Sequence, residues 1–332
     1  MLRWRTVEDE PQGVLFADEE VVERHVGRGE FRGLEFFHVR CRTIVNRVPA
    51  ASRMPFDHTI NAYRGCSHAC VYCFARPTHP YLGFGIGDDF DHKIVVKVNA
   101  VERLRVELAS PRWQGDAIAM GTNTDPYQRA EGKYHLTRGI IGVLADAANP
   151  FSILTKSSLI LRDLDLLVAA AQRTTVRASL SIGTLDEEIW RRTEPGTPHP
   201  RQRVEAVARL NDAGIPCGVL AAPVLPGLSD GDDQLAELVD ACVGAGATSI
   251  SAMYLHLRPG VREHWFDWMA SAMPDRVAAY QRRYGGRAYL PGHEQRELST
   301  RVNGLVQAAR RRRGRRARAP RSPATRRGPP CR

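Results

Sequence analysis

The sequence predicts an α/β fold with a parallel sheet, and three observations lead to this class. From Thr59 onward, short runs rich in β-branched and apolar residues alternate with longer amphipathic segments. Six such β/α steps follow one another, which is typical of parallel strands joined by crossover helices. Polar side chains follow five of the six strands, and the carboxyl ends of parallel strands meet at one rim. An open doubly wound sheet and a closed or partly closed barrel both fit this alternation.

The part of the chain before these strands is expected to be a leader. Residues 33–40 mix aromatic and β-branched side chains in the manner of a strand, and Pro49 and Pro55 interrupt the segment after it. We therefore expect an arm that packs on the main body. The expected division of the chain is a leader over 1–57, a main domain over 58–258, a helical extension over 259–309 and a tail over 310–332.

Each predicted strand is short and bounded by turn-forming residues. The six strands span residues 59–63, 117–121, 151–154, 176–182, 217–222 and 249–255. Amphipathic helices are predicted between them over 99–108, 136–148, 162–173, 201–213 and 232–245. Asn99 and Glu102 resemble a capping box at the start of the first helix. Gly214 and Gly246 follow the last two helices as glycine stop signals.

The positive charge of the chain is concentrated at its carboxyl end. The formal net charge is +10, but residues 310–332 hold eleven arginines and no acidic residue. Residues 1–309 then hold 36 basic and 37 acidic residues, a net charge of −1. A segment rich in Arg, Pro, Ala, Ser and Gly cannot bury an apolar face, so we expect it to be disordered. It is either a solvated tail without function or an arm that binds nucleic-acid phosphates in a salt-dependent way.

Composition also limits the cellular setting. The 332 residues are 43% hydrophobic, which is enough for a large core, yet no run of about 18 apolar residues exists to span a membrane. Residues 1–5 lead into acidic residues rather than an apolar signal core, so a cytoplasmic protein without a membrane partner is predicted. Seven cysteines, three of them clustered, argue against a disulfide framework. The isolated thiols, expected to be buried or unreactive, are Cys41, Cys217, Cys242 and Cys331.

The clustered thiols Cys66, Cys70 and Cys73 form a C-x3-C-x2-C loop that offers three thiolates and no obvious fourth ligand. A cubic four-iron cluster takes four ligands, so three cysteines leave one iron open to an exogenous group. A structural zinc ion prefers a closed tetrahedral set, and the second half of such a pattern is absent downstream. Three unrelated buried cysteines are the other alternative, although free cysteines seldom cluster within eight residues.

The run from Cys66 to Cys73, with the aromatic Tyr72 just before the last cysteine, resembles the signature of the radical S-adenosylmethionine (SAM) superfamily. The resemblance implies that Cys66, Cys70 and Cys73 hold a [4Fe-4S] cluster whose open iron chelates SAM. It implies one-electron cleavage of SAM to a 5′-deoxyadenosyl radical, with a flavodoxin- or ferredoxin-type reductant as partner. It also implies a partial (β/α)6 barrel of the TIM type, with the cluster loop after the first strand.

The SAM-binding residues are expected at the carboxyl ends of the strands. Lys156 is a flexible cation suited to the SAM carboxylate or ribose oxygens, and Asp125 is suited to the methionine amine or the ribose. Tyr72 is expected to lie against the adenine or to shield the cluster, as the superfamily resemblance implies. The alternatives are that Lys156 is a surface lysine, that residues 122–126 around Asp125 form only a polar turn, and that Tyr72 serves core packing. The complete expected set is Tyr72, Asn123, Thr124, Asp125, Lys156, Ser157 and Ser181.

Four further residues near these segments are candidates for supporting roles. His68 lies inside the cysteine loop, and Arg76 follows it as a candidate partner for the cluster's negative charge. Glu194 and Arg203 flank a proline-rich helix entry after the fourth strand. They are expected either to shape that entry or to reach the SAM ribose or a substrate.

The resemblance extends over about residues 56–257 and is greatest to the spore photoproduct lyase-like branch, in particular to uncharacterised members. The motifs that carry it are Gly-Thr-Asn-Thr-Asp-Pro-Tyr-Gln, Thr-Lys-Ser and Glu-Pro-Gly-Thr-Pro. True lyases of the branch repair a thymine dimer and carry a hydrogen-donating cysteine beside the second strand's end. This chain has Gly121 and Thr122 there, and Tyr127 or Tyr254 would have to substitute as donor.

These observations lead to one functional hypothesis and two alternatives. The chain is predicted to be a radical SAM enzyme of lyase or oxidoreductase type, with [4Fe-4S] and SAM as cofactors and nucleic acid among its candidate substrates. No catalytic residue beyond the cofactor-binding set is assigned. The alternatives are an iron-sulfur protein without radical turnover and a zinc-binding module.

Overall fold

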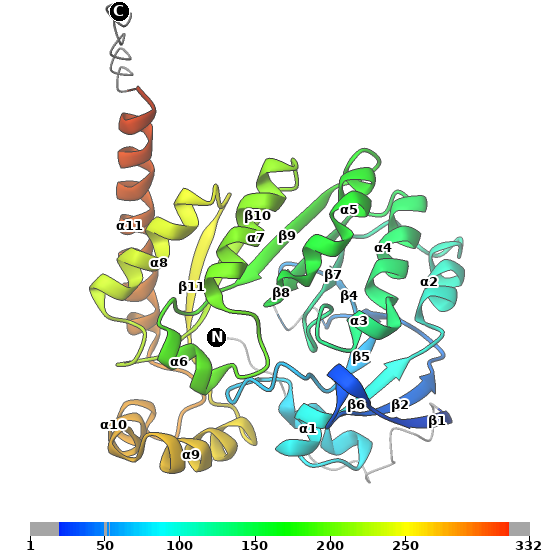
Figure 1. Ribbon diagram of the computed structural model, residues 1–332, viewed down its shortest axis with the longest axis horizontal. Helices are drawn as coiled ribbons and strands as arrows, with labels where there is room; N and C mark the ends of the chain where they lie inside the picture. Colours follow the sequence, from blue (N-terminus) through cyan, green and yellow to red (C-terminus); the bar gives the residue numbers. More distant parts are fainter. Residues whose placement is uncertain (1–19, 50–51, 53, 319–332) are drawn as a thin grey trace, which may run out of the picture.

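The computed structural model describes residues 20–49, 52 and 54–318, whose strands form two sheets (Figure 1). The larger sheet has seven strands in the order β11-β10-β9-β8-β7-β4-β3, and the smaller has four in the order β1-β2-β6-β5. Among the described residues, no helix is both long and apolar enough to cross a membrane.

Six strands of the larger sheet are parallel to their neighbours and follow one another in chain order. They are β4 (His58–Ile60), β7 (Ile118–Met120), β8 (Phe151–Thr155), β9 (Val176–Ser181), β10 (Cys217–Val224) and β11 (Ile250–Tyr254). Each lies within or across a predicted strand, so the six predictions are confirmed. The short β3 (Val45–Arg47) pairs antiparallel with β4 at one edge. The α/β class with sequentially ordered parallel strands, as in a partial barrel, is therefore confirmed.

The crossover helices line one face of this sheet (Figure 1). They are α2 (Ala100–Leu108), α4 (Leu136–Asp146), α5 (Leu164–Ala171), α7 (Pro200–Asp212) and α8 (Asp232–Gly244), which confirms the five predicted helices. Pro200 occupies the first turn of α7, where a missing N–H costs nothing. Apolar side chains of helices and strands, such as Ile153, Val207 and Leu238, are buried against one another in the core.

The smaller sheet joins the leader to the main domain. The leader contributes β1 (Glu20–Val26) and β2 (Glu35–Arg40), and β2 confirms the predicted strand over 33–40. β2 pairs in parallel with β6 (Lys93–Lys97), which the sequence analysis did not predict, and β6 pairs with β5 (Tyr63–Arg64). The side chains of Ile94, Val95 and Val96 are fully buried, so β6 lies at the centre of this sheet.

Short elements connect these units. They are the helices α1 (Asp88–His92), α3 (Glu131–Tyr134) and α6 (Glu187–Thr193), with short 3₁₀ helices over Gly29–Phe31, Arg76–Thr78, Pro80–Leu82 and Ser158–Asp163.

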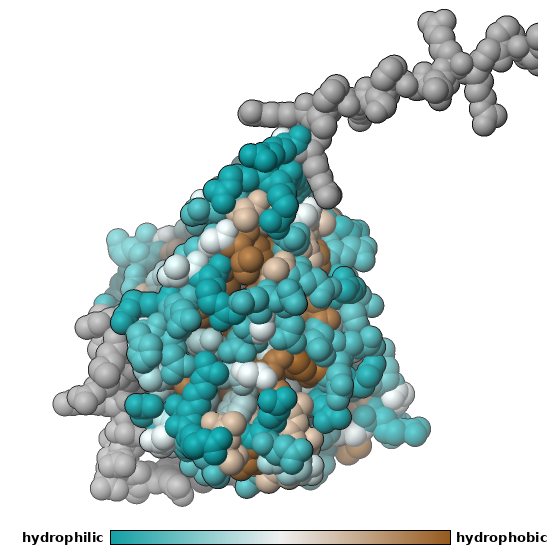
Figure 2. Space-filling model, turned by 90° about the vertical axis from the view of Figure 1, so that its left-hand side faces the viewer, coloured by the Kyte–Doolittle hydropathy of each residue, from teal (hydrophilic) through white to brown (hydrophobic). Residues whose placement is uncertain are grey.

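The carboxyl end of the chain is helical. After α9 (Val261–Ala272) and α10 (Pro274–Tyr284), the long α11 (Gly292–Arg318) runs beside α8 and β11 (Figure 1). In Figure 2 this side of the molecule faces the viewer, and hydrophilic residues cover the upper end of the helix above apolar patches.

The tail that the sequence analysis expected to be disordered from residue 310 begins inside α11, so that boundary is wrong for residues 310–318. Arginine is a good helix former, and the arginines here also have partners. Arg310 donates to the Thr248 carbonyl (3.1 Å), and Arg313 donates to the Gly244 carbonyl (3.0 Å) at the end of α8. The Arg313 bond satisfies a carbonyl that the end of α8 leaves unpaired, and the Arg310 bond ties α11 to the segment before β11. Residues 319–332, which include Cys331, lie outside the described part.

Candidate active site

The cysteine loop connects β5 to the turn at Arg76–Thr78, beyond the carboxyl end of β4. Cys66 and Cys70 are buried, and Cys73 is half-buried. Burial raises the pKa of Cys70 well above its usual value and that of Cys73 to about 11, and the charges of neighbouring thiolates add to both shifts. The three thiols stand in one loop of eight residues, and as thiolates they would repel one another. A bound cation would remove this repulsion, so the donor set fits a metal centre.

The start of the loop is fixed by the segment after β7. Gly65 has a positive φ of 75°, and a Cβ added there would lie 2.8 Å from the Lys93 carbonyl oxygen. The Gly65 carbonyl accepts hydrogen bonds from Thr124 Oγ1 (2.8 Å) and Gln128 Nε2 (3.0 Å). Gln128 Oε1 in turn accepts from the Ser67 N–H (3.0 Å). Two polar side chains thus set the backbone on both sides of Cys66.

The second half of the loop is held by Arg76, whose side chain is fully buried. Its Nε and Nη2 donate to the Cys70 carbonyl at 3.1 and 3.0 Å, and Nη2 also pairs with Asp91 at 2.8 Å. The guanidinium lowers the pKa of Cys73, although burial of that thiol prevails. Arg76 is therefore beside the thiols, as the sequence analysis expected of a partner for a negatively charged cluster.

A buried His68–Asp125 pair links the cysteine loop to the sheet, with His68 Nδ1 3.4 Å from Asp125 Oδ2. Asp125 also accepts from Thr155 Oγ1 (2.6 Å), the Lys156 N–H (2.7 Å) and the Tyr127 N–H (2.9 Å). Burial alone would raise the pKa of Asp125, but His68 and these donors hold it below its usual range. Burial would lower the pKa of His68, whereas Asp125 and Cys66 raise it to about 10. Both groups are therefore charged at neutral pH.

A second charged network surrounds Lys156 at the end of β8. Its ammonium donates to Ser181 Oγ (2.8 Å), Glu194 Oε1 (3.1 Å) and the Ala222 carbonyl (3.3 Å), so all three N–H groups have partners. It also lies 5.5 Å from the centre of the Tyr72 ring. The side chain of Lys156 is 14% exposed, which leaves it a small opening to solvent. Side chains or carbonyls at the ends of β8, β9 and β10 thus meet the cysteine loop.

Glu194 is the centre of this network. Its carboxylate accepts from Tyr72 Oη and Arg203 Nη2 in addition to Lys156, and Thr197 Oγ1 lies 3.2 Å away. Burial would raise the pKa of Glu194, but the Arg203 guanidinium and the Lys156 ammonium hold it far below its usual range. Glu194 is therefore ionised and fully occupied by donors from the protein.

The structure brings Tyr72, Asp125, Lys156 and Ser181 together at one end of the parallel sheet, where the sequence analysis placed them. Two of the other expected SAM contacts use their hydroxyls within the protein. Thr124 binds the Gly65 carbonyl, and Ser157 Oγ accepts from the Leu159 N–H at 3.2 Å as a helix cap. The Asn123 N–H donates to Asn61 Oδ1 (3.2 Å), and its own side chain is half-buried.

Sequence reasoning missed the joint role of Glu194, Arg203 and Gly196. Gly196 N–H donates to the His68 carbonyl (3.0 Å), and a Cβ added to Gly196 would lie 2.1 Å from the Ser67 carbonyl oxygen. The Glu-Pro-Gly-Thr-Pro motif therefore lies directly against the cysteine loop. The motif itself was visible in the sequence, but its contact with a loop more than a hundred residues away was not. Gln128 ends the Gly-Thr-Asn-Thr-Asp-Pro-Tyr-Gln motif, but its contact with the cysteine loop was not predicted.

The end of β7 has no room for a side chain. Gly121 has a positive φ of 86°, and an added Cβ would lie 1.8 Å from the Leu154 carbonyl oxygen. A cysteine at residue 121 is therefore incompatible with this backbone. Of the two alternative hydrogen donors, Tyr127 is buried beside Asp125, and Tyr254 Oη donates to Asp230 at 3.2 Å.

Sequence comparison relates this chain to proteins of one family. Residues 60–239 match the model of the family described as the radical SAM superfamily. An uncharacterised protein of Mycobacterium tuberculosis strain H37Rv is 46% identical over 283 residues, which are 85% of this chain and 83% of that protein. A protein of Pseudomonas phage M6 named radical SAM Nalpha-GlyT isomerase is 26% identical over 169 residues, 51% of this chain and 33% of that protein.

Solved structures of spore photoproduct lyase have the same fold. One, complexed with dinucleoside spore photoproduct, aligns with a TM-score of 0.59 and 17% identity over 82% of this chain and 79% of that protein. This similarity extends the fold assignment beyond the residues that match the family model. The loop with three thiols, the sequentially ordered parallel strands and the family match over residues 60–239 agree, and the chain belongs to the radical SAM superfamily.

Proposed function

We propose that the chain is a radical SAM enzyme that binds a [4Fe-4S] cluster through Cys66, Cys70 and Cys73 and seats SAM beside it. When bound, this pair supplies a 5′-deoxyadenosyl radical that abstracts a hydrogen atom from the substrate. The observation that carries the proposal is the meeting of three thiols in one loop, two buried and one half-buried, with a charged network at the carboxyl ends of the strands. The role of the protein itself is to hold the cluster, to orient SAM and to shield the site from water.

In this proposal Lys156 and Asp125 bind the polar end of SAM. Lys156 has a fixed position because Glu194 and Ser181 hold its ammonium, and exchange of its long bond to the Ala222 carbonyl (3.3 Å) would free one N–H for the SAM carboxylate. Asp125 is kept ionised by His68 and can accept from the methionine amine. Asn123 supplies a further hydrogen-bonding group beside them, and Ser181, whose hydroxyl accepts from Lys156 and donates to the Ala222 carbonyl (2.8 Å), holds Lys156 in place.

We assign Thr124 and Ser157 to positioning rather than to direct SAM contact. Thr124 orients the backbone before Cys66, and Ser157 caps the turn that follows Lys156. Both side chains are buried. They would therefore influence SAM binding indirectly, by positioning the cysteine loop and the segment around Lys156.

Tyr72 is proposed to shield the site from water. Its ring lies 6.5 Å, centre to centre, from that of the fully buried Trp265 on α9, and its hydroxyl is bound to Glu194. Burial and the Glu194 charge raise the pKa of Tyr72, so it stays a neutral phenol. A neutral aromatic wall of this kind excludes water from a reactive radical.

The substrate is proposed to be a nucleic acid. Spore photoproduct lyase, which shares the fold and was solved with a dinucleoside photoproduct, supports this class. The four arginines of residues 319–332 would bind phosphates without sequence preference. The backbone at Gly121 argues against hydrogen return from a thiol at that place, so lyase or oxidoreductase chemistry would need another donor. A flavodoxin- or ferredoxin-type reductant in the cytoplasm is the proposed electron source.

Anaerobic reconstitution tests the cofactor part of the proposal. About four iron and four sulfide per chain are expected, and with SAM and dithionite the protein should release 5′-deoxyadenosine. The Cys70→Ala variant should lose both, whereas Cys242→Ala, a buried thiol on α8, should keep both. Iron without 5′-deoxyadenosine would indicate an iron-sulfur protein without turnover. Zinc in place of iron after anaerobic purification would indicate a zinc-binding module.

A further inference from the structure

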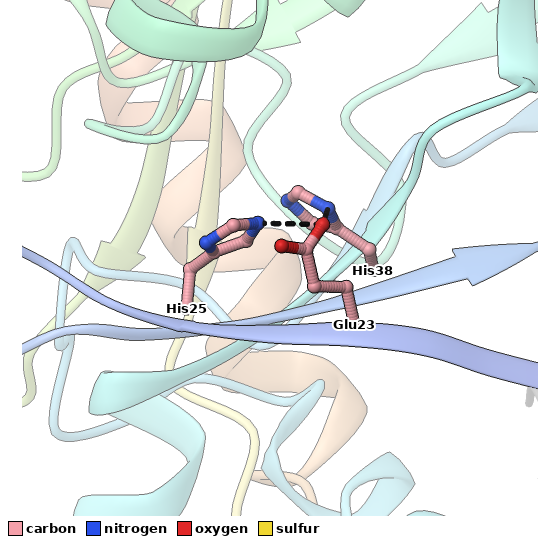
Figure 3. A group of neighbouring side chains, drawn as sticks. All are labelled: Glu23, His25 and His38. Carbon is pink, nitrogen blue, oxygen red and sulfur yellow. Dashed lines mark ion pairs between the residues drawn. The ribbon is translucent and has the colours of Figure 1, made fainter.

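Three potential metal ligands lie on one face of the β1–β2 hairpin (Figure 3). Glu23 and His25 are two residues apart on β1, so their side chains leave the strand on the same face. His38 is the register partner of Glu23 on β2. The hairpin is at the edge of the small sheet, and β6 separates it from β5, which leads into the cysteine loop.

The distances within this cluster fit a single small cation. Glu23 Oε2 lies 2.9 Å from His25 Nε2 and 3.6 Å from His38 Nδ1, and the three ligand atoms are within 4.8 Å of one another. Atoms bound tetrahedrally to one zinc ion at about 2.0–2.1 Å stand roughly 3.3 Å apart. The observed separations lie on both sides of this value, so small side-chain rotations would complete the site.

His38 also has the outer partner that a metal-bound histidine requires. Its Nδ1 faces Glu23, and its Nε2 lies 2.8 Å from the Tyr134 hydroxyl on α3. With Nδ1 bound to a cation, Nε2–H donates to Tyr134 Oη, which fixes the tautomer and the ring orientation. The rings of His25 and His38 are 4.4 Å apart, centre to centre, and also restrain each other.

Of the neighbouring cations, Arg24 is directed away from the ligand face, whereas the charge of Lys133, after burial and His25, helps to lower the pKa of His38. Arg24 points to the other face of β1, as its alternation with Glu23 and His25 requires, and is bound to Glu35. Lys133 places its ammonium over the Phe36 and Tyr134 rings, at 5.1 and 5.2 Å from their centres.

We propose that Glu23, His25 and His38 bind a divalent first-row transition metal, with Zn²⁺ as the best match. Two imidazoles and one carboxylate form a familiar three-ligand zinc set that leaves the fourth position to water. The side chains of Glu23 and His25 are 57% and 35% exposed, so solvent reaches that position. The site shares no residue with the cysteine loop and stands independently of the proposed radical chemistry.

A cation here would join three parts of the chain. It would tie β1 to β2 directly, and through His38 and Tyr134 it would tie both strands to α3. Arg129, just before α3, already donates to the Glu30 carbonyl in the hairpin loop. Metal binding should therefore stabilise the packing of the hairpin on the main domain.

Zinc titration of the full-length, cluster-reconstituted protein tests this site. The probe is ZnCl₂, followed by calorimetry and by metal analysis after desalting. The wild type should bind about one zinc per chain and melt at a higher temperature with zinc. His25→Gln and His38→Gln should weaken zinc binding by at least about tenfold and remove the rise in melting temperature, and Tyr134→Phe should weaken binding by about tenfold.

The matched control is His293→Gln, an exposed histidine at the start of α11, which should bind zinc as the wild type does. Equal iron content and circular dichroism across the variants separate loss of this site from zinc captured by the cysteines or from misfolding. A wild type that binds no zinc, or hairpin variants that keep wild-type affinity, would show that Glu23, His25 and His38 are an ordinary surface cluster.

Discussion

Glu194 and Arg203 form a buried ion pair directly behind Lys156, with the Arg203 side chain only 1% exposed. Arg203 also donates to the Ser181 carbonyl (3.0 Å) and the Pro198 carbonyl (3.0 Å). One guanidinium thus fixes both the acidic partner of Lys156 and the backbone of its hydroxyl partner, Ser181. The position of the Lys156 ammonium depends on a pair of residues that cannot themselves reach solvent.

Removal of the Glu194 charge should therefore lower both the stability of the protein and its affinity for SAM. Glu194→Gln leaves Arg203 buried without its counter-ion, which should lower the free energy of unfolding by about 3 kcal/mol and weaken SAM binding through Lys156. Urea unfolding and equilibrium dialysis with SAM measure the two effects. The control Glu187→Gln breaks an exposed pair with Arg191 and should change stability by less than about 1 kcal/mol. A Glu194→Gln protein as stable as this control would contradict the role given to the pair.

The same pair predicts a pH dependence. Because folding lowers the pKa of Glu194, its contribution to stability is fully present above the ordinary glutamate pKa of about 4.3 and is lost as the pH falls below it. The stability difference between wild type and Glu194→Gln should be constant from pH 7 to about pH 5 and should shrink at lower pH. Urea unfolding at each pH measures it. A difference that already shrinks between pH 7 and 6 would mean that Glu194 is not held ionised.

A side chain introduced at Gly121 should disrupt the end of β7. Gly121→Cys places a Cβ 1.8 Å from the Leu154 carbonyl oxygen at a backbone φ of 86°, so loss of several kcal/mol of stability or of soluble protein is expected. Gly142→Ala on α4 is the control, because a Cβ there meets nothing within 4 Å and should stabilise the helix by about 0.5–1 kcal/mol. A Gly121→Cys protein that folds with wild-type stability would refute the steric argument and reopen thiol chemistry at this site.

The hydrogen bonds to Gly65 should determine how firmly the loop holds its metal. Thr124→Val removes the 2.8 Å bond to the Gly65 carbonyl and should reduce the iron retained per chain after anaerobic desalting. Thr300→Val, an exposed threonine on α11, removes only a bond to the Arg296 carbonyl within its own helix. It should retain iron as the wild type does, and equal retention by both variants would mean that Thr124 has no part in positioning the loop.

Truncation at two points separates the structural arginines from those of the tail. A chain that ends at residue 309 loses Arg313, whose bond caps the end of α8, and Arg310, whose bond caps the segment after it, so its melting temperature should fall. A chain that ends at residue 318 keeps α11 and should melt as the full chain does. Equal melting temperatures for the two truncated chains would show that these caps contribute nothing.

The chain that ends at residue 318 also tests the phosphate-binding arm. It lacks the four arginines of residues 319–332, so its affinity for single-stranded DNA should depend less steeply on salt, by a slope of about 3. Binding measured from 50 to 200 mM salt gives this slope. An unchanged slope would assign DNA binding, if any, to the body of the protein.

The sequence was sufficient for the features that local patterns encode. The six parallel strands and five helices follow from apolar periodicity and glycine stops, which act over a few residues. The capping box predicted at Asn99, in contrast, is wrong because its side chain binds the Cys41 backbone. The strand β6 was missed because it follows α1 directly and is separated from α2 by only a few residues. Its apolar run gives no sign that its partner, β2, comes from the leader.

The site was predicted in part for a similar reason. Lys156, Asp125 and Ser181 follow strands, so the parallel topology alone brings them together. The pairing of Glu194 with Arg203, and of Gly196 with the cysteine loop, depends on how a helix entry packs across the sheet. No periodicity encodes such a contact between distant segments.

The parallel pairing of β2 with β6 removes the natural place to divide this chain. β6 has β2 on one side and β5 on the other, so a shortened chain that began at residue 58 would expose the edge of a strand whose three central residues are apolar. An unpaired edge of this kind invites strand addition by other molecules. The cysteine loop follows β5 directly, so the proposed cluster site would be built beside an aggregation-prone edge. Work on the minimal catalytic unit of this protein should therefore begin upstream of β1.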